Sequence, residues 1–217
     1  VVLYDNLVDR WLLSEFSNAG NKLCVYVSKT ANPVSGGWWA YSFQAPSFPD
    51  YPKYGVWPDA YYASSNETSP AVYALDRQRM LQGLSATSQR FTASSLAGFS
   101  FQALTPADLD GPTAPPSGAS AIFARHRDAE VHNAGSNNTS QDYLDLFEFH
   151  VDWTTPANST FSGPTSLAVT EFDSSLCGLT SFNCIPQPGS ATTLDPLREV
   201  VMFRLAYRNF GSYGSLV

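Results

Sequence analysis

The feature that most constrains this chain is an internal repeat, in which the same order of connector and strands recurs roughly every fifty to sixty residues. Each repeat opens with a connector that contains Asp and often Pro, and an apolar strand, a turn and further strands follow. The connectors are residues 4–9, 55–59, 105–111 and 194–197, and the strands that they lead into are 11–16, 60–64, 121–126 and 200–207.

A repeated sheet unit that cannot shield both of its faces from water needs a neighbour on each side. Three units and a fourth partial one (approximately 1–50, 51–103, 104–175 and 194–217) predict a single all-β domain over 1–217. We expect a β-propeller with about three and a half blades in this chain, whose ring a second polypeptide, a fragment or a missing segment completes. A β-sandwich is the alternative. The absence of an initiator Met is typical of a processed product or a fragment.

Local patterns refine this expectation. A period-two run over 145–153 predicts a strand with one buried and one mostly polar face. One short helix is expected over 76–83, because Asp76 is a favourable N-cap and Gly83 a favourable residue after the last turn. The Pro-rich stretches 45–58 and 104–116 are expected to be connectors, and the last strand is expected over 199–207.

Composition limits the compartment and the partners. Hydrophobic residues make up 43% of the chain and charged residues only 14%, well below the usual ~25%. We therefore expect a secreted, extracellular protein whose surface is covered by Ser, Thr, Asn, Gln, Gly and Pro. A net charge of −7 repels phosphate backbones and argues against nucleic-acid binding. No apolar run approaches the ~20 residues of a membrane-spanning helix, so we expect no membrane insertion.

The sequence contains three cysteines. Cys177 and Cys184 bracket a short loop, and in an oxidising compartment we expect them to form a disulfide. Free thiols or a metal site are the alternatives, although the spacing is too wide for a zinc knuckle. Cys24 lies in an apolar strand pattern, which favours a buried free thiol.

The aspartates of the connectors are the best candidates for chemistry. In a propeller, equivalent positions of successive blades converge near the axis on one face. Carboxylates gathered there attract a hard cation such as Ca²⁺ or act as general acid and base, whereas the alternative is that each one caps its own turn. We expect Trp57 on the same face, where connector aromatics either stack on sugar rings or pack in the core. The four aspartates are Asp9, Asp59, Asp110 and Asp195.

Two other groups of residues suggest weaker sites. Asp108 and Asp110 resemble the start of a calcium loop, but the later ligands of an EF-hand are missing. A run of alternating His and acidic residues would share one face of an extended chain, either as a metal or acid–base cluster or as a solvated hairpin tip. The members of that run are His126, Asp128, Glu130 and His132.

Several segments carry a family resemblance. The most distinctive is Val-Trp-Pro-Asp-Ala-Tyr-Tyr at 56–62, and the others are 9–16, 74–81, 147–153 and 198–205. On these residues the chain resembles large secreted bacterial β-propeller-like proteins, most of which have no assigned function. The resemblance implies a propeller fold and carries over no catalytic residue.

These observations favour a non-catalytic extracellular recognition or structural module that binds a glycan or a divalent cation at the axial face. The alternative is a polysaccharide-active hydrolase or lyase that uses axial carboxylates, and two carboxyl groups ~5–9 Å apart in a cleft would favour it. A surface-assembly subunit is a third possibility, which a large apolar edge completed by a second chain would favour. The sequence contains no nucleophile elbow, phosphate loop or zinc-protease motif.

Overall fold

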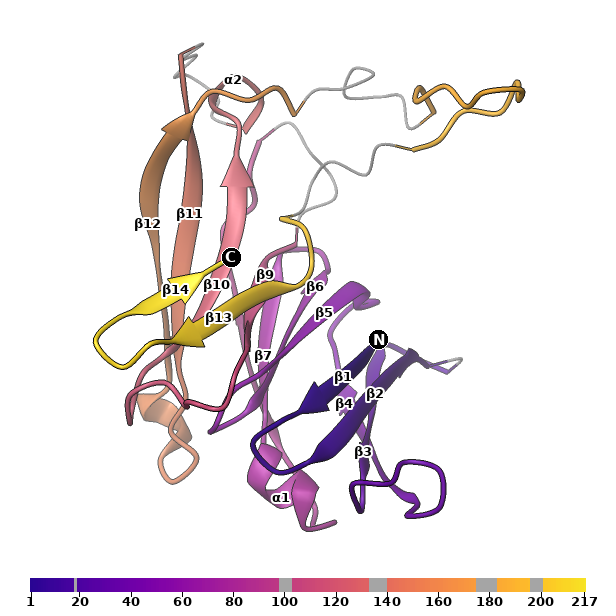
Figure 1. The fold of residues 1–217 in the computed structure, drawn as a ribbon, viewed down its shortest axis with the longest axis vertical. Helices are drawn as coiled ribbons and strands as arrows, with labels where there is room; N and C mark the ends of the chain where they lie inside the picture. The colour runs from indigo at the N-terminus through magenta and orange to yellow at the C-terminus, as the bar shows by residue number, and fades with distance from the viewer. Residues whose placement is uncertain (18, 98–102, 133–139, 175–182, 196–200) are drawn as a thin grey trace.

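The computed structural model describes residues 1–17, 19–97, 103–132, 140–174, 183–195 and 201–217 of the chain. The all-β prediction is confirmed, since strands of three antiparallel four-stranded meanders account for most of the described regular structure (Figure 1). The first sheet is formed by β1 (Val2–Asp5), β2 (Arg10–Phe16), β3 (Lys22–Ser28) and β4 (Trp38–Gln44) in that order.

The second and third sheets repeat this order. The second consists of β5 (Asp50–Val56), β6 (Tyr61–Asn66), β7 (Ala71–Leu75) and β8 (Ser88–Thr92). The third consists of β9 (Thr105–Leu109), β10 (Ala121–Arg127), β11 (Gln141–His150) and β12 (Thr160–Thr170). Its β9 edge is extended by a hairpin, in which β13 (Leu205–Asn209) pairs in parallel with β9 and β14 (Gly214–Leu216) pairs with β13.

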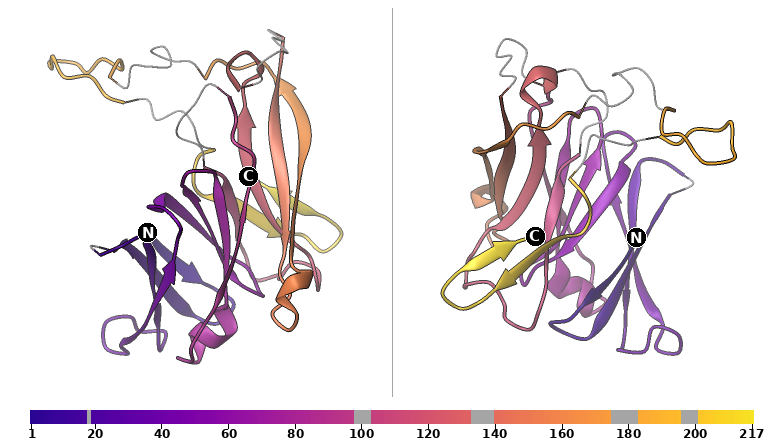
Figure 2. Two further views of the ribbon diagram at one scale, coloured as in Figure 1. Left: turned by 180° about the vertical axis from the view of Figure 1, so that it is seen from behind. Right: turned by 45° about the horizontal axis from the view of Figure 1, so that its top comes forward.

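The second sheet lies between the other two (Figures 1 and 2). Its central strands β6 and β7 are buried along nearly their whole length, so neither face of these two strands meets water. Tyr61 points into a hydrophobic core shared with the first sheet, whereas the next residue, Tyr62, points into a second core shared with the third sheet. Phe149 and Phe123 of the third sheet pack edge-on against the Tyr62 ring.

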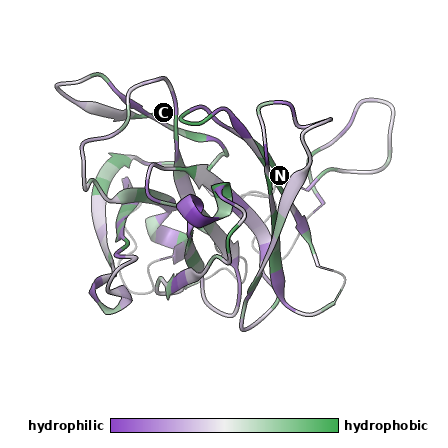
Figure 3. Cartoon of the chain, turned by 90° about the horizontal axis from the view of Figure 1, so that it is seen from below, coloured by the Kyte–Doolittle hydropathy of each residue, from purple (hydrophilic) through white to green (hydrophobic). Residues whose placement is uncertain are grey.

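The helices are short. α1 (Arg77–Leu81) confirms the helix expected over 76–83, because the Asp76 carboxylate accepts a hydrogen bond from the Arg79 N–H at 3.2 Å and Gly83 has a φ of +69°. α2 (Ala129–His132) and the 3₁₀ turn η1 (Pro156–Asn158) flank β11. Seen from below, hydrophobic segments recur along the strands, whereas α1 is largely hydrophilic (Figure 3). Within the described ranges, no helix has both the length and the apolar character needed to cross a bilayer.

Three local expectations are wrong. The stretches 45–58 and 104–116, expected to be connectors, contain the strands β5 and β9. Pro52 and Pro106 interrupt the strand pattern of these segments in the sequence, yet each strand keeps enough N–H groups to pair with β6 or β10. The strand expected over 199–207 begins at Leu205 and is followed by a further strand, β14, and residues 196–200 lie outside the described part of the chain.

Removing a ring from the core between the second and third sheets tests this arrangement. Phe149 is fully buried and contacts the rings of Tyr62, Phe91 and Phe161. We expect Phe149→Ala to lower the free energy of unfolding by about 3–5 kcal/mol, because it leaves a cavity in a packed core. The measurement is urea unfolding followed by tryptophan fluorescence. Phe210→Ala is the matched control, since Phe210 is 52% exposed. Equal effects of the two substitutions would contradict the packing described above.

Candidate functional site

A cavity of about 510 Å³ opens at the α1 end of the molecule, where the second sheet meets the third. Three segments form its walls: the tight turn between β5 and β6, the long loop between β9 and β10, and the end of β11. We call this cavity the Asp59 pocket. It is lined by Trp57, Pro58, Asp59, residues 114–119, His150 and Val151.

Asp59 is held firmly at this pocket. Its backbone carbonyl accepts a hydrogen bond from Trp153 Nε1 at 2.9 Å, and its Oδ2 accepts one from the Tyr62 hydroxyl at 3.3 Å. Its second carboxylate oxygen, Oδ1, is buried and has no hydrogen-bond partner within the described residues. Burial raises the pKa of Asp59, and the nearby hydrogen bonds and His150 oppose that rise only in part. An acceptor atom without a donor is costly in a protein interior, so a donor that reached Oδ1 from the pocket beside it would be favoured.

Trp57 supports the pocket instead of offering an open platform. Its ring is 1% exposed, its Nε1 donates to the carbonyl of Ala119 at 3.1 Å, and its edge packs against Tyr207. Tyr54 is also fully buried, so Trp57 and Tyr54 both pack in the core. The Trp57 contact with Ala119 fastens the long β9–β10 loop to the β5–β6 turn.

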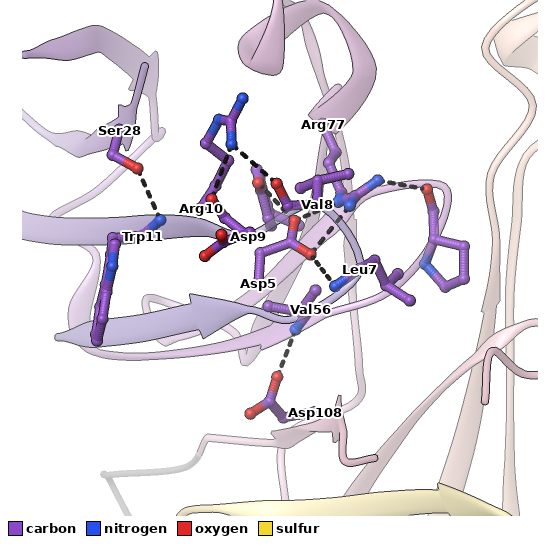
Figure 4. A network of polar contacts seen from close by, with 12 residues as sticks. Asp5, Leu7, Val8, Asp9, Arg10, Trp11, Ser28, Val56, Arg77 and Asp108 are labelled. Atoms are coloured by element: carbon purple, nitrogen blue, oxygen red, sulfur yellow. Dashed lines mark hydrogen bonds and ion pairs between the residues drawn. The ribbon is translucent and has the colours of Figure 1, made fainter. Parts of the chain in front are cut away.

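Asp9 lies in a different polar network, at the turn between β1 and β2 (Figure 4). It has a φ of +53° and accepts a hydrogen bond from the Tyr4 hydroxyl at 2.8 Å. The central acid of this network is Asp5, which sequence reasoning missed. Asp5 is fully buried and pairs with the Arg77 guanidinium at 2.7 and 3.0 Å.

The Asp5 network joins two sheets. The Asp5 carboxylate also accepts hydrogen bonds from the Tyr61 hydroxyl at 2.8 Å and from the Leu7 N–H at 3.1 Å. Because both oxygens of its carboxylate accept hydrogen bonds in this way, Asp5 has a structural role and links the first sheet to the second. The signal in the sequence was an Asp in an otherwise apolar strand, which requires a buried partner.

The residues expected to resemble a calcium loop face arginines. Asp108 is buried, accepts a hydrogen bond from the Val56 N–H at 2.8 Å and pairs with Arg204. Asp110 lies 3.6 Å from Arg204 and 3.8 Å from Arg208. Asp108 thus links β9 to β5, and the carboxylates of Asp108 and Asp110 both have arginine neighbours.

The alternating His and acidic run does not form one extended face, because β10 ends at Arg127 and α2 begins at Ala129. The turn brings the rings of His126 and His132 to 5.4 Å instead. Burial, together with the neighbouring His126, lowers the pKa of His132 to about 4, so its imidazole is neutral at pH 7. The Asp128 N–H donates to His132 Nδ1 at 3.0 Å.

Carboxylates do gather beside α2. Oxygens of Asp128, Glu130 and Asp142 lie within 4.8 Å of one another, a grouping that could hold a metal ion. Most of these oxygens already accept backbone hydrogen bonds: Asp128 from residues 130, 131 and 174, and Asp142 from residues 129 and 172. Ca²⁺ prefers six to eight oxygens. The cluster thus accepts backbone N–H groups of residues 129–131, 172 and 174, and Ca²⁺ binding stays a prediction.

The remaining predicted residues lie elsewhere. The segment 183–195, which contains Asp195, extends from the upper end of the molecule, opposite to α1 (Figure 1). Cys177 lies outside the described residues, so its pairing with Cys184 stays a prediction. Cys24 is a free thiol, but it is half-buried on the outward side of the first sheet and does not lie in the core. Of the five predicted axial residues, only Asp59 and Trp57 share a cavity.

No protein-family model, no curated protein and no solved structure matches this chain. The resemblance to secreted propeller-like proteins therefore stays a prediction.

The buried charge of Asp59 has a measurable consequence. Because its pKa is higher in the folded chain than in the unfolded chain, the folded state holds the proton more tightly. Its contribution to the free energy of unfolding is therefore present at low pH and is lost as pH rises through the folded pKa. We expect Asp59→Asn to remove this loss and to stabilise the chain at pH 7 by on the order of 1 kcal/mol.

Urea unfolding at a series of pH values measures the effect. Asp152→Asn is the control with the opposite sign, because hydrogen bonds from the Thr155 N–H and the Asn158 side chain lower the pKa of Asp152. Removing that charge should weaken the chain at neutral pH. An Asp59→Asn variant with the same pH dependence as the wild type would show that the carboxyl is not buried in solution.

Proposed function

We propose that this chain is the larger part of a β-propeller and that it acts as an extracellular recognition module, which binds a hydroxyl-rich ligand such as a glycan in the Asp59 pocket. The low content of charged residues supports an extracellular setting. Glycan recognition is the reading that the walls and the single acid of the pocket favour.

The arrangement of the sheets supports the propeller. Each of the three meanders begins with the strand closest to its neighbours, since β5 contacts both β1 and β9. The β13–β14 hairpin is hydrogen-bonded to the β9 edge of the third sheet. In this proposal it stands where the chain would begin its next blade. A two-layer sandwich buries one face of each sheet. Here the central strands of the second sheet, β6 and β7, have both faces buried, which favours radial stacking.

The unpaired Asp59 Oδ1 carries the proposal for the ligand. A sugar hydroxyl donates to a carboxylate, while pyranose C–H faces pack well against apolar walls such as Pro58, Val151 and residues 114–119. A Ca²⁺ ion is a poorer fit, because the pocket offers one carboxylate, Asp59, and the imidazole of His150 has no oxygen, whereas Ca²⁺ prefers six to eight oxygens. A small neutral carbohydrate satisfies both the acid and the walls.

The pocket argues against the hydrolase alternative. Glycoside hydrolysis usually needs two carboxyl groups about 5–9.5 Å apart on either side of the bond that is cleaved. Asp59 is the single carboxylate among the lining residues of this pocket. Asp152, which follows closely after the lining residue Val151, is instead used by the η1 turn, where it accepts the N–H groups of residues 154 and 155. Binding without cleavage is what this lining supports.

A panel of neutral oligosaccharides on an array, followed by calorimetry with the strongest binder, tests the proposal. We expect Asp59→Ala to weaken binding by about tenfold to a hundredfold, because the variant loses a hydrogen bond to a charged acceptor. Asp110→Ala, which changes an acid outside the pocket, should bind like the wild type. Binding to no member of the panel, or equal affinity of Asp59→Ala and the wild type, would refute the glycan site.

A further inference from the structure

The outward side of the first sheet is an apolar surface. In β1 and β2, residues on the inward side enter the core shared with the second sheet, as Leu3 and Leu12 do. The alternate residues on the outward side are mostly apolar, with the exposed Glu15 near the end of β2, and Val2 among them is 60% exposed. An antiparallel sheet with one wet face normally alternates apolar with polar residues. We call this surface, formed by Val2, Tyr4, Trp11, Leu13 and Tyr26, the open face.

The open face has a buried counterpart in the same chain. In the first sheet, Val2 pairs with Leu13, which pairs with Tyr26. In the second sheet, the row that pairs in the same order is Tyr54, Ala63 and Tyr73.

The neighbouring row repeats the match, with Tyr4 opposite Trp11 in the first sheet and Val56 opposite Tyr61 in the second. The residues of the second sheet are all buried beneath the first sheet. The first sheet thus presents outward the type of surface that the second sheet buries against a neighbour.

A second apolar surface lies at the opposite end of the stack. In β10 to β12, the residues that alternate with the buried Phe123 and Phe149 face away from the second sheet. Ile122 and Leu146 on this side are half-buried, and they line a cavity of about 340 Å³ together with the exposed Glu148. Leu167 on β12 is 45% exposed. We call this surface, formed by Ile122, Leu144, Leu146 and Leu167, the far face.

We infer that the open face binds the far face of a second copy of this chain, in a head-to-tail contact between sheets. The inference rests on the radial stacking proposed above, because it continues the same sheet-to-sheet junction from one copy to the next. A second copy is the occupant because one molecule carries both surfaces, so a single type of contact covers both. Such a contact is heterologous: it leads to a closed ring where the rotation between copies allows it.

The free thiol of Cys24 lies on the same outward side of β3 as Tyr26, so it reports whether the open face is covered. In the assembled state the neighbouring copy shields this thiol. Its reaction with a thiol reagent such as Ellman's reagent should therefore slow by at least about tenfold as protein concentration rises into the range of assembly. The reaction rate is compared with that of a Cys24→Ser variant, which lacks this thiol.

Mixing two variants tests the head-to-tail geometry. Val2→Glu places a charge in the open face, and Leu167→Glu places one in the far face. Each variant alone should weaken assembly by at least tenfold, as measured by sedimentation equilibrium against the chain mass of 23.6 kDa. A mixture of the two should form 1:1 dimers, because the far face of the first variant and the open face of the second are intact. Val34→Glu, at a site 93% exposed in a loop, is the matched control and should assemble like the wild type.

The outcomes separate this inference from the proposed function. A wild-type chain that is monomeric up to about 100 μM, or a mixture that fails to restore dimers, overturns head-to-tail assembly. If Val2→Glu unfolds the chain, the rate of the Cys24 reaction is compared between the wild type and Leu167→Glu. A slower reaction in the wild type supports the head-to-tail contact, and equal rates overturn it. Glycan binding by the Asp59 pocket is measured on the same samples. Monomers that still bind refute only the second copy, whereas assembled chains without binding refute only the glycan site.

Discussion

The structure depends on the central strands of the second sheet, β6 and β7, having no face toward water. Tyr61 and Tyr62, adjacent in sequence, occupy two different cores, so the same strand holds the first sheet on one side and the third on the other. Losing either neighbour would expose a fully apolar face. Two acids that this stacking buries are paired across the junctions: Asp5 with Arg77 between the first two sheets, and Asp108 with the Val56 N–H between the second and third.

The same constraint places the Asp59 pocket. The turn after β5 spans only residues 57–60, so it cannot move away from the core that Trp57 and Tyr62 enter. The loop after β9 is longer, and its attachment through Ala119 to the Trp57 indole makes it a wall of the cavity. A tight turn and a long loop meeting at one junction leave a hollow with a fixed acid in it. The site therefore follows from unequal loop lengths on an otherwise repetitive scaffold.

Sequence reasoning predicted the all-β class, the strands with clear alternation and the capped α1 helix, because these signals are local. It failed for β5 and β9, whose identity as strands depends on pairing with distant residues and is obscured by Pro52 and Pro106. It also placed four aspartates at one face, although only the loop geometry decides what each one meets. Asp59 reaches a cavity, Asp110 meets arginines and Asp9 bonds to Tyr4. Equal positions in a repeat do not give equal surroundings.

The sequence of the first sheet shows how its apolar residues are distributed between the two faces of β1 and β2. Val2, Leu3 and Tyr4 are consecutive apolar residues, as are Trp11, Leu12 and Leu13, so both faces of β1 and β2 are apolar. Consecutive apolar residues also fill β7 and begin β6, where both faces are covered. The free-energy gain of about 25 cal/mol per Å² of apolar surface removed from water favours covering such a face. The sequence of the first sheet is thus suited to an interior position, with another sheet on its outward side.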